Sequence, residues 1–383
     1  MHPVRPKLLR TLAVTLAAAT ALAGCGVAED AASGDQAEGN GTERELLAEL
    51  EMEWMWSPPP PASVGMPAAE GEDVAVTWGR QRLVVLDRAG ALRWESPRQD
   101  LRDVAPVFTS QLVLAPTEDG LAAFDRRSGR ARWEAKLGDR TNTPAISGAT
   151  AVVTTWEGNL AGIDLRDGKV RWQTKLGGNS LGPPAASGTT VVATFATQVK
   201  AGAVAVDAAS GRQRWAVALP AGAAGGTSAP AIVAVPGAGD VAVVVAADLA
   251  AHGLSLDNGA ERWRSEVEGA GSPEVPPLAL AGGKVLAAHQ LGGMAMLDAR
   301  DGTKEWAASS DQAAVRGGPA GPGPNGWFAM PLYDGSLMLA QAGYTEFRDP
   351  PGLTTGVARG PGNLLLIGVG QGTENGLNAA VGW

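Results

Sequence analysis

The sequence is poor in the side chains that most often carry chemistry. Its 383 residues include one cysteine and three histidines. A single cysteine excludes an internal disulfide and any metal site built from several cysteines. The histidines, at 2, 252 and 289, belong to no H-x3-H or H-E-x2-H pattern, and no glycine loop ends in Lys-Ser or Lys-Thr to bind a phosphate. The sequence therefore predicts no catalytic residue, no metal site and no cofactor.

Positive charge and long hydrophobic runs are also scarce. The chain has 31 Lys and Arg residues against 40 Asp and Glu residues, which gives a formal net charge of −9. So acidic a protein is a poor partner for nucleic acid. No uninterrupted apolar run of about 18 residues follows the N-terminal segment, so we expect no membrane-spanning helix in the remainder of the chain.

Residues 1–24 have the organisation of an export signal. Arg5, Lys7 and Arg10 precede or open an apolar run over 8–22 that is shorter than the roughly 20 residues a bilayer requires. The next residues, Leu22-Ala23-Gly24-Cys25, resemble the lipobox of bacterial lipoproteins. The resemblance implies cleavage before Cys25 and a lipid on its thiol, and removal of the signal changes the net charge from −9 to −12. An ordinary cleavable signal and an uncleaved anchor are the alternatives.

Residues 25–49 are expected to form a flexible acidic tether. Seven acidic residues face one basic residue, Arg44, and most of the others are small or polar. Such a segment buries too little apolar surface to offset its ordering entropy. At Leu50 the pattern changes to an alternation of apolar and polar residues that continues to Trp56 and predicts a half-buried strand. We therefore expect a single folded domain over 50–383.

What the sequence does contain in quantity is glycine, proline and tryptophan. There are 52 glycines and 26 prolines, and tryptophan accounts for 12 of the 19 aromatic residues. The tryptophans mark an internal repeat of roughly forty residues with the pattern Asp-x3-Gly-x3-Trp. Four copies are complete: Asp125, Gly129 and Trp133; Asp164, Gly168 and Trp172; Asp207, Gly211 and Trp215; Asp298, Gly302 and Trp306. Two are imperfect: Asp87, Gly90 and Trp94 lack one residue of the turn, and Gly259 and Trp263 follow Ser255 in place of aspartate.

Each repeat contains four short apolar segments separated by turn residues. In the third repeat, strands are expected around 144–146, 151–155, 160–164 and 169–172. Four short strands per repeat are typical of a β-propeller blade. Glycine allows a positive φ in the tight turn, aspartate accepts turn N–H groups, and tryptophan offers a large surface that can lock one blade against the next. We assign the repeated residues structural roles.

The repeat resembles the PQQ-type repeat of quinoprotein-like β-propellers, in which a tryptophan docks each blade. The resemblance rests on the phased copies and on the Ala-x-Asp strand ends such as Ala123-Phe124-Asp125, and it extends from about Trp54 to the C-terminus. Within this group, the size and lipobox are most similar to the outer-membrane assembly lipoproteins that carry eight blades. The resemblance implies an all-β propeller of four-stranded antiparallel blades with docking tryptophans.

The repeats predict eight blades, with seven as the alternative count. Six blades carry a tryptophan, and a seventh follows with a turn at Asp334-Gly335 and Phe347 where a tryptophan is expected. The last repeat ends before an outer strand. Residues 50–56 can supply that strand, because Trp56 precedes Trp94 by 38 residues and so has the phase of the repeat. Pairing of this N-terminal strand with the last blade would close the ring and remove its open edges.

Function must be inferred from sites, and the sequence offers few. The leading hypothesis is a non-catalytic, monomeric scaffold, anchored to the membrane by lipid and binding envelope proteins or peptides through loops. It would lie outside the cytoplasm, on the outer face of the plasma membrane if the envelope has one membrane. A quinone-dependent dehydrogenase is one alternative, although no adjacent cysteines or acidic cluster match such a site. A propeller that binds a small ligand in its central funnel is the other.

Overall fold

The structure of the chain is a computed structural model. It describes residues 51–58, 63–180, 182–222, 226–267, 275–289, 291–314, 318–323, 326–332, 336–342, 344–348, 353–371 and 376–381. The expected signal over 1–24, the expected tether over 25–49 and Cys25 lie outside these ranges. Apart from the 3-10 helix η1 (Pro361–Asn363), every regular element within them is a β-strand. In this part of the chain no helix has the length and hydrophobicity that crossing a membrane requires.

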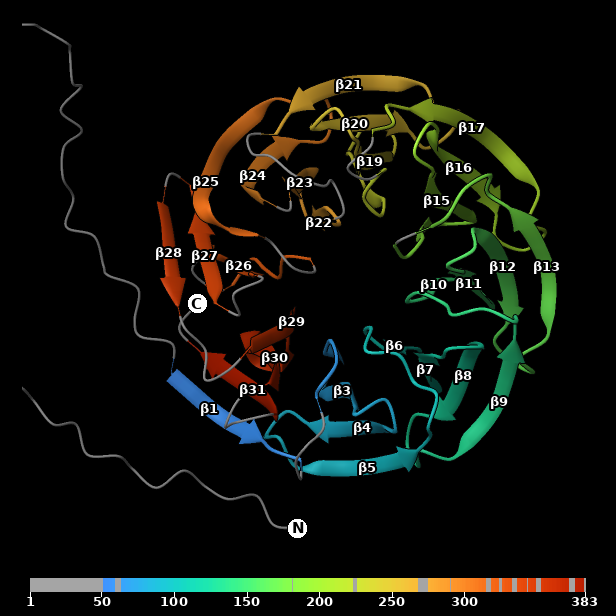
Figure 1. Ribbon diagram of the computed structural model, residues 1–383, viewed down its shortest axis with the longest axis vertical. Coiled ribbons are helices and arrows are strands. Elements are labelled where there is room, and N and C mark those ends of the chain that lie inside the picture. Colours follow the sequence, from blue (N-terminus) through green and yellow to red (C-terminus); the bar gives the residue numbers. More distant parts are fainter. Residues whose placement is uncertain are drawn as a thin grey trace, which may run out of the picture.

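The strands form eight antiparallel sheets arranged around a ring, which we number along the chain (Figure 1). Sheet 1 contains β2 (Ala68–Glu70), β3 (Asp73–Trp78), β4 (Arg82–Asp87) and β5 (Leu92–Pro97). Sheet 2 contains β6 (Val107–Phe108), β7 (Leu112–Pro116), β8 (Gly120–Asp125) and β9 (Ala131–Lys136). Sheet 3 contains β10 (Ala145–Ser147), β11 (Thr150–Thr154), β12 (Asn159–Asp164) and β13 (Val170–Lys175). Sheet 4 contains β14 (Ala185–Ser187), β15 (Thr190–Ala196), β16 (Ala201–Asp207) and β17 (Gln213–Leu219).

The remaining sheets continue the ring in the same order. Sheet 5 contains β18 (Ala231–Val233), β19 (Val241–Val245), β20 (Ala250–Ser255) and β21 (Glu261–Glu266). Sheet 6 contains β22 (Leu278–Leu280), β23 (Lys284–Ala288), β24 (Leu291–Asp298) and β25 (Lys304–Ala314). Sheet 7 contains β26 (Phe328–Pro331), β27 (Leu337–Gln341) and β28 (Tyr344–Arg348). Sheet 8 contains β29 (Leu353–Arg359), β30 (Leu365–Gln371), β31 (Gly376–Val381) and β1 (Glu51–Trp56). The predicted all-β propeller of four-stranded antiparallel sheets is thus confirmed.

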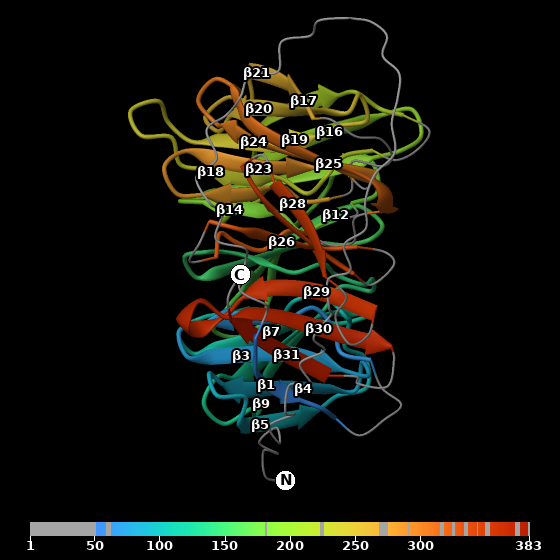
Figure 2. The same cartoon turned by 90° about the vertical axis from the view of Figure 1, so that its left-hand side faces the viewer.

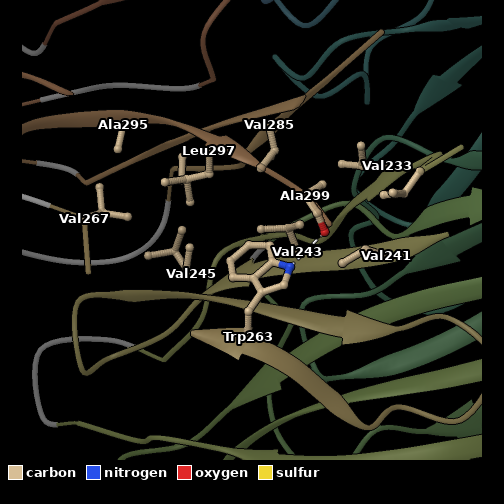
Figure 3. Close-up of a cluster of buried hydrophobic side chains, with 13 residues drawn as sticks. Val233, Val241, Val243, Val245, Trp263, Val267, Val285, Ala295, Leu297 and Ala299 are labelled. Carbon is tan, nitrogen blue, oxygen red and sulfur yellow. Dashed lines mark hydrogen bonds between the residues drawn. The ribbon is translucent and has the colours of Figure 1, made fainter. Parts of the chain in front are cut away.

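The middle strands of each sheet are buried on both faces, whereas the outermost strand is solvated. All five residues of β7 are buried, whereas four of the six residues of β9 are exposed and only Ala135 is buried. The apolar side chains of neighbouring sheets interlock to form a small core at each boundary. Figure 3 shows the core between sheets 5 and 6, where Val243 and Val245 of β19 face Val285 of β23 and Leu297 of β24. The fold is therefore held together by a series of cores around the ring.

The ring is closed by the N-terminal strand, as the sequence predicts. β1 pairs with β31 from Glu51 opposite Val381 to Trp56 opposite Leu377. Both views place β1 at the outer edge of sheet 8, next to sheet 1 (Figures 1 and 2). The first and last described strands therefore share one sheet. Their pairing leaves no open strand edge where the ring closes.

Sheet 7 departs from the four-strand pattern because its innermost strand is reduced to one bridge. Ala320 and Ala329 exchange two backbone hydrogen bonds, of 2.8 and 2.9 Å. The next donor in an antiparallel ladder would be residue 322, which is a proline without an N–H group. Gly323 instead donates to the Trp327 carbonyl, at 2.8 Å. The ladder stops there, so sheet 7 has three full strands.

Seven outer strands share a one-residue register shift immediately before a tryptophan. The pairs that follow the shift are Ala379–Trp54, Val85–Trp94, Ala123–Trp133, Gly162–Trp172, Ala205–Trp215, Gly253–Trp263 and Met296–Trp306. Such a bulge bends the strand and changes the direction of the next side chain. It thus positions the tryptophan at the boundary with the following sheet.

Candidate functional site

Six tryptophans link each sheet to the next through the same hydrogen bond. The indole N–H donates to the backbone carbonyl of the residue after the motif aspartate, or after its counterpart, in the following sheet. The pairs are Trp54–Arg88, Trp94–Arg126, Trp133–Leu165, Trp172–Ala208, Trp215–Leu256 and Trp263–Ala299, all at 2.8 or 2.9 Å. Figure 3 shows the last of these bonds. The indole thus satisfies a carbonyl of the motif turn while its ring packs in the boundary core.

The repeated glycines lie directly against these indole rings. Gly302 has a φ of +76°, and a Cβ added there would lie 2.7 Å from Cε3 of Trp263. Gly90, Gly129, Gly168, Gly211 and Gly259 meet the tryptophan of the preceding sheet in the same way, all with a φ between +69° and +76°. Two features therefore require glycine at these positions. One is the positive φ, and the other is the close approach of the indole ring, which the repeat pattern alone did not indicate.

The motif aspartates accept hydrogen bonds from the N–H groups of the same turn. Oδ1 accepts from Ser128 at Asp125, from Arg166 at Asp164, from Ser210 at Asp207 and from Arg300 at Asp298, over 2.9–3.1 Å. A hydrogen bond from the Arg214 guanidinium is the main cause that lowers the pKa of Asp207 to about 2. The pKa of Asp164 is lowered mainly by Arg166. Each carboxylate therefore caps its own turn, and those of Asp164, Asp207 and Asp298 also pair with a cationic side chain on another strand of the same sheet.

Trp54, rather than the expected Trp56, docks sheet 8 onto sheet 1. Trp54 is 7% exposed and donates to the Arg88 carbonyl, while Trp56 packs edge-on against Trp78 with ring centroids 6.3 Å apart. The expected phase was wrong by two residues. Trp54 and Trp56 point to the same side of the strand, so a count of about forty residues cannot separate them, whereas the position of the bulge does.

Sheet 7 has no tryptophan in the docking register. β28 pairs with β27 without a register shift, so Glu346 lies opposite Leu339, where the other sheets place tryptophan. Phe347, expected at that position, pairs with Met338 instead. Trp306, which precedes this sheet, lies 6.1 Å from the Phe328 ring. The expected Asp334-Gly335 turn lies outside the described residues.

The two histidines of the propeller are buried and bonded. His252 is 3% exposed, and its Nδ1 and Nε2 lie 2.7 Å from Glu261 Oε2 and 3.1 Å from Asp248 Oδ1. His289 Nε2 lies 3.1 Å from the Leu249 carbonyl, and burial lowers the pKa of His289. Within the described ranges no three His, Cys, Asp or Glu side chains gather as a metal site would require.

The sequence contains one serine in a pattern that resembles a catalytic motif. Residues 178–182 read Gly-Asn-Ser-Leu-Gly, which matches the G-x-S-x-G pattern of a nucleophile elbow. That elbow joins a strand to a helix and exposes its serine. Ser180 instead lies in the connector between β13 and β14 and is completely buried. Its hydroxyl lies 3.4 Å from the Gly182 carbonyl. Its position is that of a connector residue packed between two sheets.

The two faces of the ring differ in the loops they carry. The motif turns, between the third and fourth strands of a sheet, lie on one face, which we call the motif-turn face. The hairpins between the second and third strands, and the connectors from one sheet to the next, lie on the other, which we call the connector face. Isolated bridges such as Thr141–Thr155 and Asn179–Ala196 join connectors to hairpins on that face. Exposed apolar side chains on the connector face are candidates for partner contacts.

Trp156 and Val199 are the exposed large apolar residues of two adjacent connector-face hairpins. Trp156, after β11, is 38% exposed, and Val199, after β15, is 89% exposed. The loops between them are bonded: Leu176 donates to the Gly158 carbonyl at 2.9 Å, and Asn179 exchanges bonds of 3.1 and 2.9 Å with Ala196. We call this continuous region over sheets 3 and 4 the Trp156–Val199 surface.

Cationic side chains lie over the aromatic rings of this surface. The Arg140 guanidinium lies 3.9 Å from the Trp156 ring centroid, and the Lys200 ammonium 5.4 Å from that of Phe195. Such contacts hold long side chains in place while leaving their charge accessible. Tryptophan and arginine are also the residues most often responsible for binding energy at protein interfaces. The surface therefore has the composition of a protein-binding site.

Fold and docking residues together define a tryptophan-docked β-propeller, and comparison with known proteins identifies its family. The family model described as outer membrane protein assembly factor BamB matches residues 30–176 and 117–329. Since these matches cover more than half of the chain, the chain belongs to this family. The predicted PQQ-type repeat is thereby confirmed. A comparison with curated protein sequences finds no significant match.

Solved structures support the fold. BamB from Moraxella catarrhalis superposes with a TM-score of 0.69 at 18% identity, covering 86% of this chain and 99% of that one. The C-terminal WD40 domain of Sif2 gives 0.69 at 10% identity, covering 88% and 99%. A europium-containing methanol dehydrogenase gives 0.64 at 13% identity, covering 84% and 85%. At these identities the likeness concerns the fold alone, since these structures differ in function.

Proposed function

We propose that the protein is an exported lipoprotein, held on a membrane through Cys25, that acts as a monomeric and non-catalytic scaffold for other envelope proteins. The observation that carries the scaffold role is the Trp156–Val199 surface on a ring whose sheets are locked together by indole hydrogen bonds. A rigid ring with variable loops presents such a surface at little entropic cost. The family description adds outer-membrane protein assembly as the first process in which to seek the partner.

The path of the chain supports an orientation for this scaffold. Trp54 of β1 bonds to the Arg88 carbonyl of a motif turn, and β1 then runs toward Trp78 at the connector-face end of β3. The segment before Glu51 is therefore joined to the ring at the motif-turn face. A flexible tether over 25–49 would have a root-mean-square length of about 25–30 Å. The motif-turn face would lie toward the membrane and the Trp156–Val199 surface away from it.

The anchor is tested by replacing Cys25. Wild type is expected to incorporate a radiolabelled fatty acid and to fractionate with membranes, since acylation provides the only attachment proposed. Cys25→Ala should lose both properties and retain its fold by circular dichroism. Membrane association of Cys25→Ala equal to that of wild type would refute the lipid anchor. In a single-membrane envelope the labelled protein would lie on the outer face of the plasma membrane.

The scaffold role is tested with a matched pair of valines on opposite faces. A photo-crosslinking amino acid is placed at Val199 or at Val170, which begins β13 beside a motif turn and is 38% exposed. We expect a discrete protein adduct in native membranes at position 199, lost on Trp156→Ala, and none at 170. Equal adducts at both positions, or an adduct that survives Trp156→Ala, would contradict the proposed surface.

The non-catalytic role has its own test. Purified protein incubated with a pyrroloquinoline quinone and Ca²⁺ is expected to retain no chromophore after gel filtration and to reduce no dye with alcohol or sugar substrates. A stoichiometric bound chromophore would overturn this part of the proposal and favour a dehydrogenase. The same gel-filtration run, with light scattering, checks the monomeric state.

A further inference from the structure

Beside the Trp156–Val199 surface, Arg102 places a positive charge between two connectors. It follows the bridge between Leu101 and Thr117, in the connector from sheet 1 to sheet 2. Its guanidinium Nη1 donates to the Thr141 carbonyl and lies 3.4 Å from Asn142 Oδ1, both in the connector from sheet 2 to sheet 3. Arg102 thus ties one connector to the next. That next connector also carries Arg140, immediately before Thr141.

The equivalent position of the next sheet performs the same task without charge. Asn142 follows the bridge between Thr141 and Thr155, and its amide donates to the Gly182 carbonyl at 3.2 Å and to the Ser180 carbonyl at 3.4 Å. A neutral side chain is therefore sufficient to tie two connectors together. The charge of Arg102 has no part in that structural role.

No ion pair joins Arg102 to a carboxylate in the described part of the chain. The carboxylates of Glu118 and Asp103 act on Arg102 through space, but both pair with Arg80, at 3.5 and 2.8 Å. Burial is the main cause that lowers the pKa of Arg102; the carboxylates of Glu118 and Asp103 offset part of this effect, while the charges of Arg140 and Arg80 add to it. A half-buried guanidinium without a directly paired carboxylate costs free energy that a bound anion would recover.

Arg140 is a second guanidinium without an ion pair among the described residues. It stacks on Trp156 and follows Asp139, whose carboxylate accepts from the Arg140 and Glu157 backbone N–H groups, at 2.8 and 2.7 Å. Arg102 bonds to the carbonyl of the residue immediately after Arg140. Two guanidinia without an ion pair therefore meet the same connector, at residues 140 and 141, and one of them stacks on an exposed indole.

We propose that Arg102 and Arg140 form a carboxylate-binding subsite for an acidic segment of the partner protein, whose neighbouring apolar side chain covers Trp156. This inference rests on the proposed scaffold function and specifies the chemistry of its partner. Guanidinium and carboxylate groups pair through strong, directional hydrogen bonds, and the exposed indole supplies adjacent apolar area. The partner segment thus combines Asp or Glu with Leu, Ile or Phe.

The test uses two synthetic probes and three variants of the full-length protein. The probes are fluorescent twelve-residue peptides that alternate Leu with Glu or Leu with Gln. We expect the Glu peptide to bind wild type at least about tenfold more tightly than the Gln peptide, as the loss of charge-assisted bonds implies. Arg102→Gln and Arg140→Gln should each remove most of this preference. Arg127→Gln, on an exposed motif turn, should leave it unchanged.

Stability provides a second readout that a merely structural arginine would not give. Arg102→Gln retains donors for the Thr141 carbonyl and removes the unpaired charge, so it should raise the urea midpoint of the free protein while weakening the Glu peptide. A lower midpoint with unchanged peptide binding would overturn the proposal. So would equal binding of both peptides, or sodium succinate competing as well as the Glu peptide at equal carboxylate concentration. If the Val199 adduct persists in Arg102→Gln at the wild-type level, this subsite fails while the scaffold proposal stands.

Discussion

Substitution of a repeated glycine by alanine separates backbone strain from the docking of tryptophan. Gly302 and Gly282 share a φ of +76°, but a Cβ at Gly302 would lie 2.7 Å from the Trp263 ring, whereas nothing lies within 4 Å of a Cβ at Gly282. Alanine at this φ costs about 1–2 kcal/mol at either position. At Gly302 the ring must also move, which breaks its 2.8 Å bond to the buried Ala299 carbonyl at a cost of about 1–3 kcal/mol.

Equilibrium urea unfolding of the two variants measures the difference directly. We expect Gly302→Ala to lose about 2 kcal/mol more than Gly282→Ala, with unchanged slopes, when the far-ultraviolet circular dichroism is followed. The shared strain cancels in this comparison, so the remainder reports the indole contact. Equal midpoints for the two variants would show that the close approach of ring and glycine contributes nothing to stability, and the docking argument would fail.

Three further outcomes follow from the docking geometry. Trp263→Phe, which leaves the Ala299 carbonyl without its donor, should lower the unfolding free energy by about 1–3 kcal/mol, whereas the same change at the exposed Trp156 should stay within about 0.5 kcal/mol. Trp54→Ala should lower the unfolding free energy by about 3–5 kcal/mol, and by more than Trp56→Ala does. The reverse order in urea unfolding would show that Trp56 is the docking residue after all. Asp207→Asn removes a carboxylate whose pKa is lowered to about 2. The stability that the ionised Asp207 carboxylate contributes is present above about pH 4 and is lost as the pH falls toward 2. The urea midpoint of wild type should therefore approach that of the variant over this interval. A difference between the two midpoints that does not change with pH would contradict the lowered pKa of Asp207.

Much of the fold could be predicted because each repeat carries its own local signals. The Asp-x3-Gly-x3-Trp pattern sets a turn and an outer strand, and alternation over residues 50–56 identified the strand that closes the ring as β1. The failures arise where register depends on one residue. Trp54 and Trp56 have the same side-chain direction, and Phe347 was expected by a spacing that includes the bulge residue, which the β27–β28 hairpin lacks.

The candidate site was less accessible from the sequence. Trp156 and Val199 occupy hairpin tips that repeat no pattern, and their exposure depends on how three loops pack together. Arg102 makes no ion pair because Arg80, from an earlier segment of the chain, pairs with Asp103 and Glu118. A tryptophan outside the repeat phase, such as Trp156, is the one signal that could have pointed to the surface. Unlike the tryptophans that occur in the repeat register, such a residue does not dock one sheet onto the next.

If the protein is exported as proposed above, closure of the ring by β1 and β31 sets the order of events during export. β1 is the first described strand to cross the membrane, and its partner over 376–381 is the last, so about 320 residues must follow β1 before the pair can form. Contacts of such sequence separation form late in folding. Sheet 8 therefore cannot be completed before residues 376–381 have emerged. Because the β1–β31 pairing forms late, the chain can pass through the membrane before the ring closes.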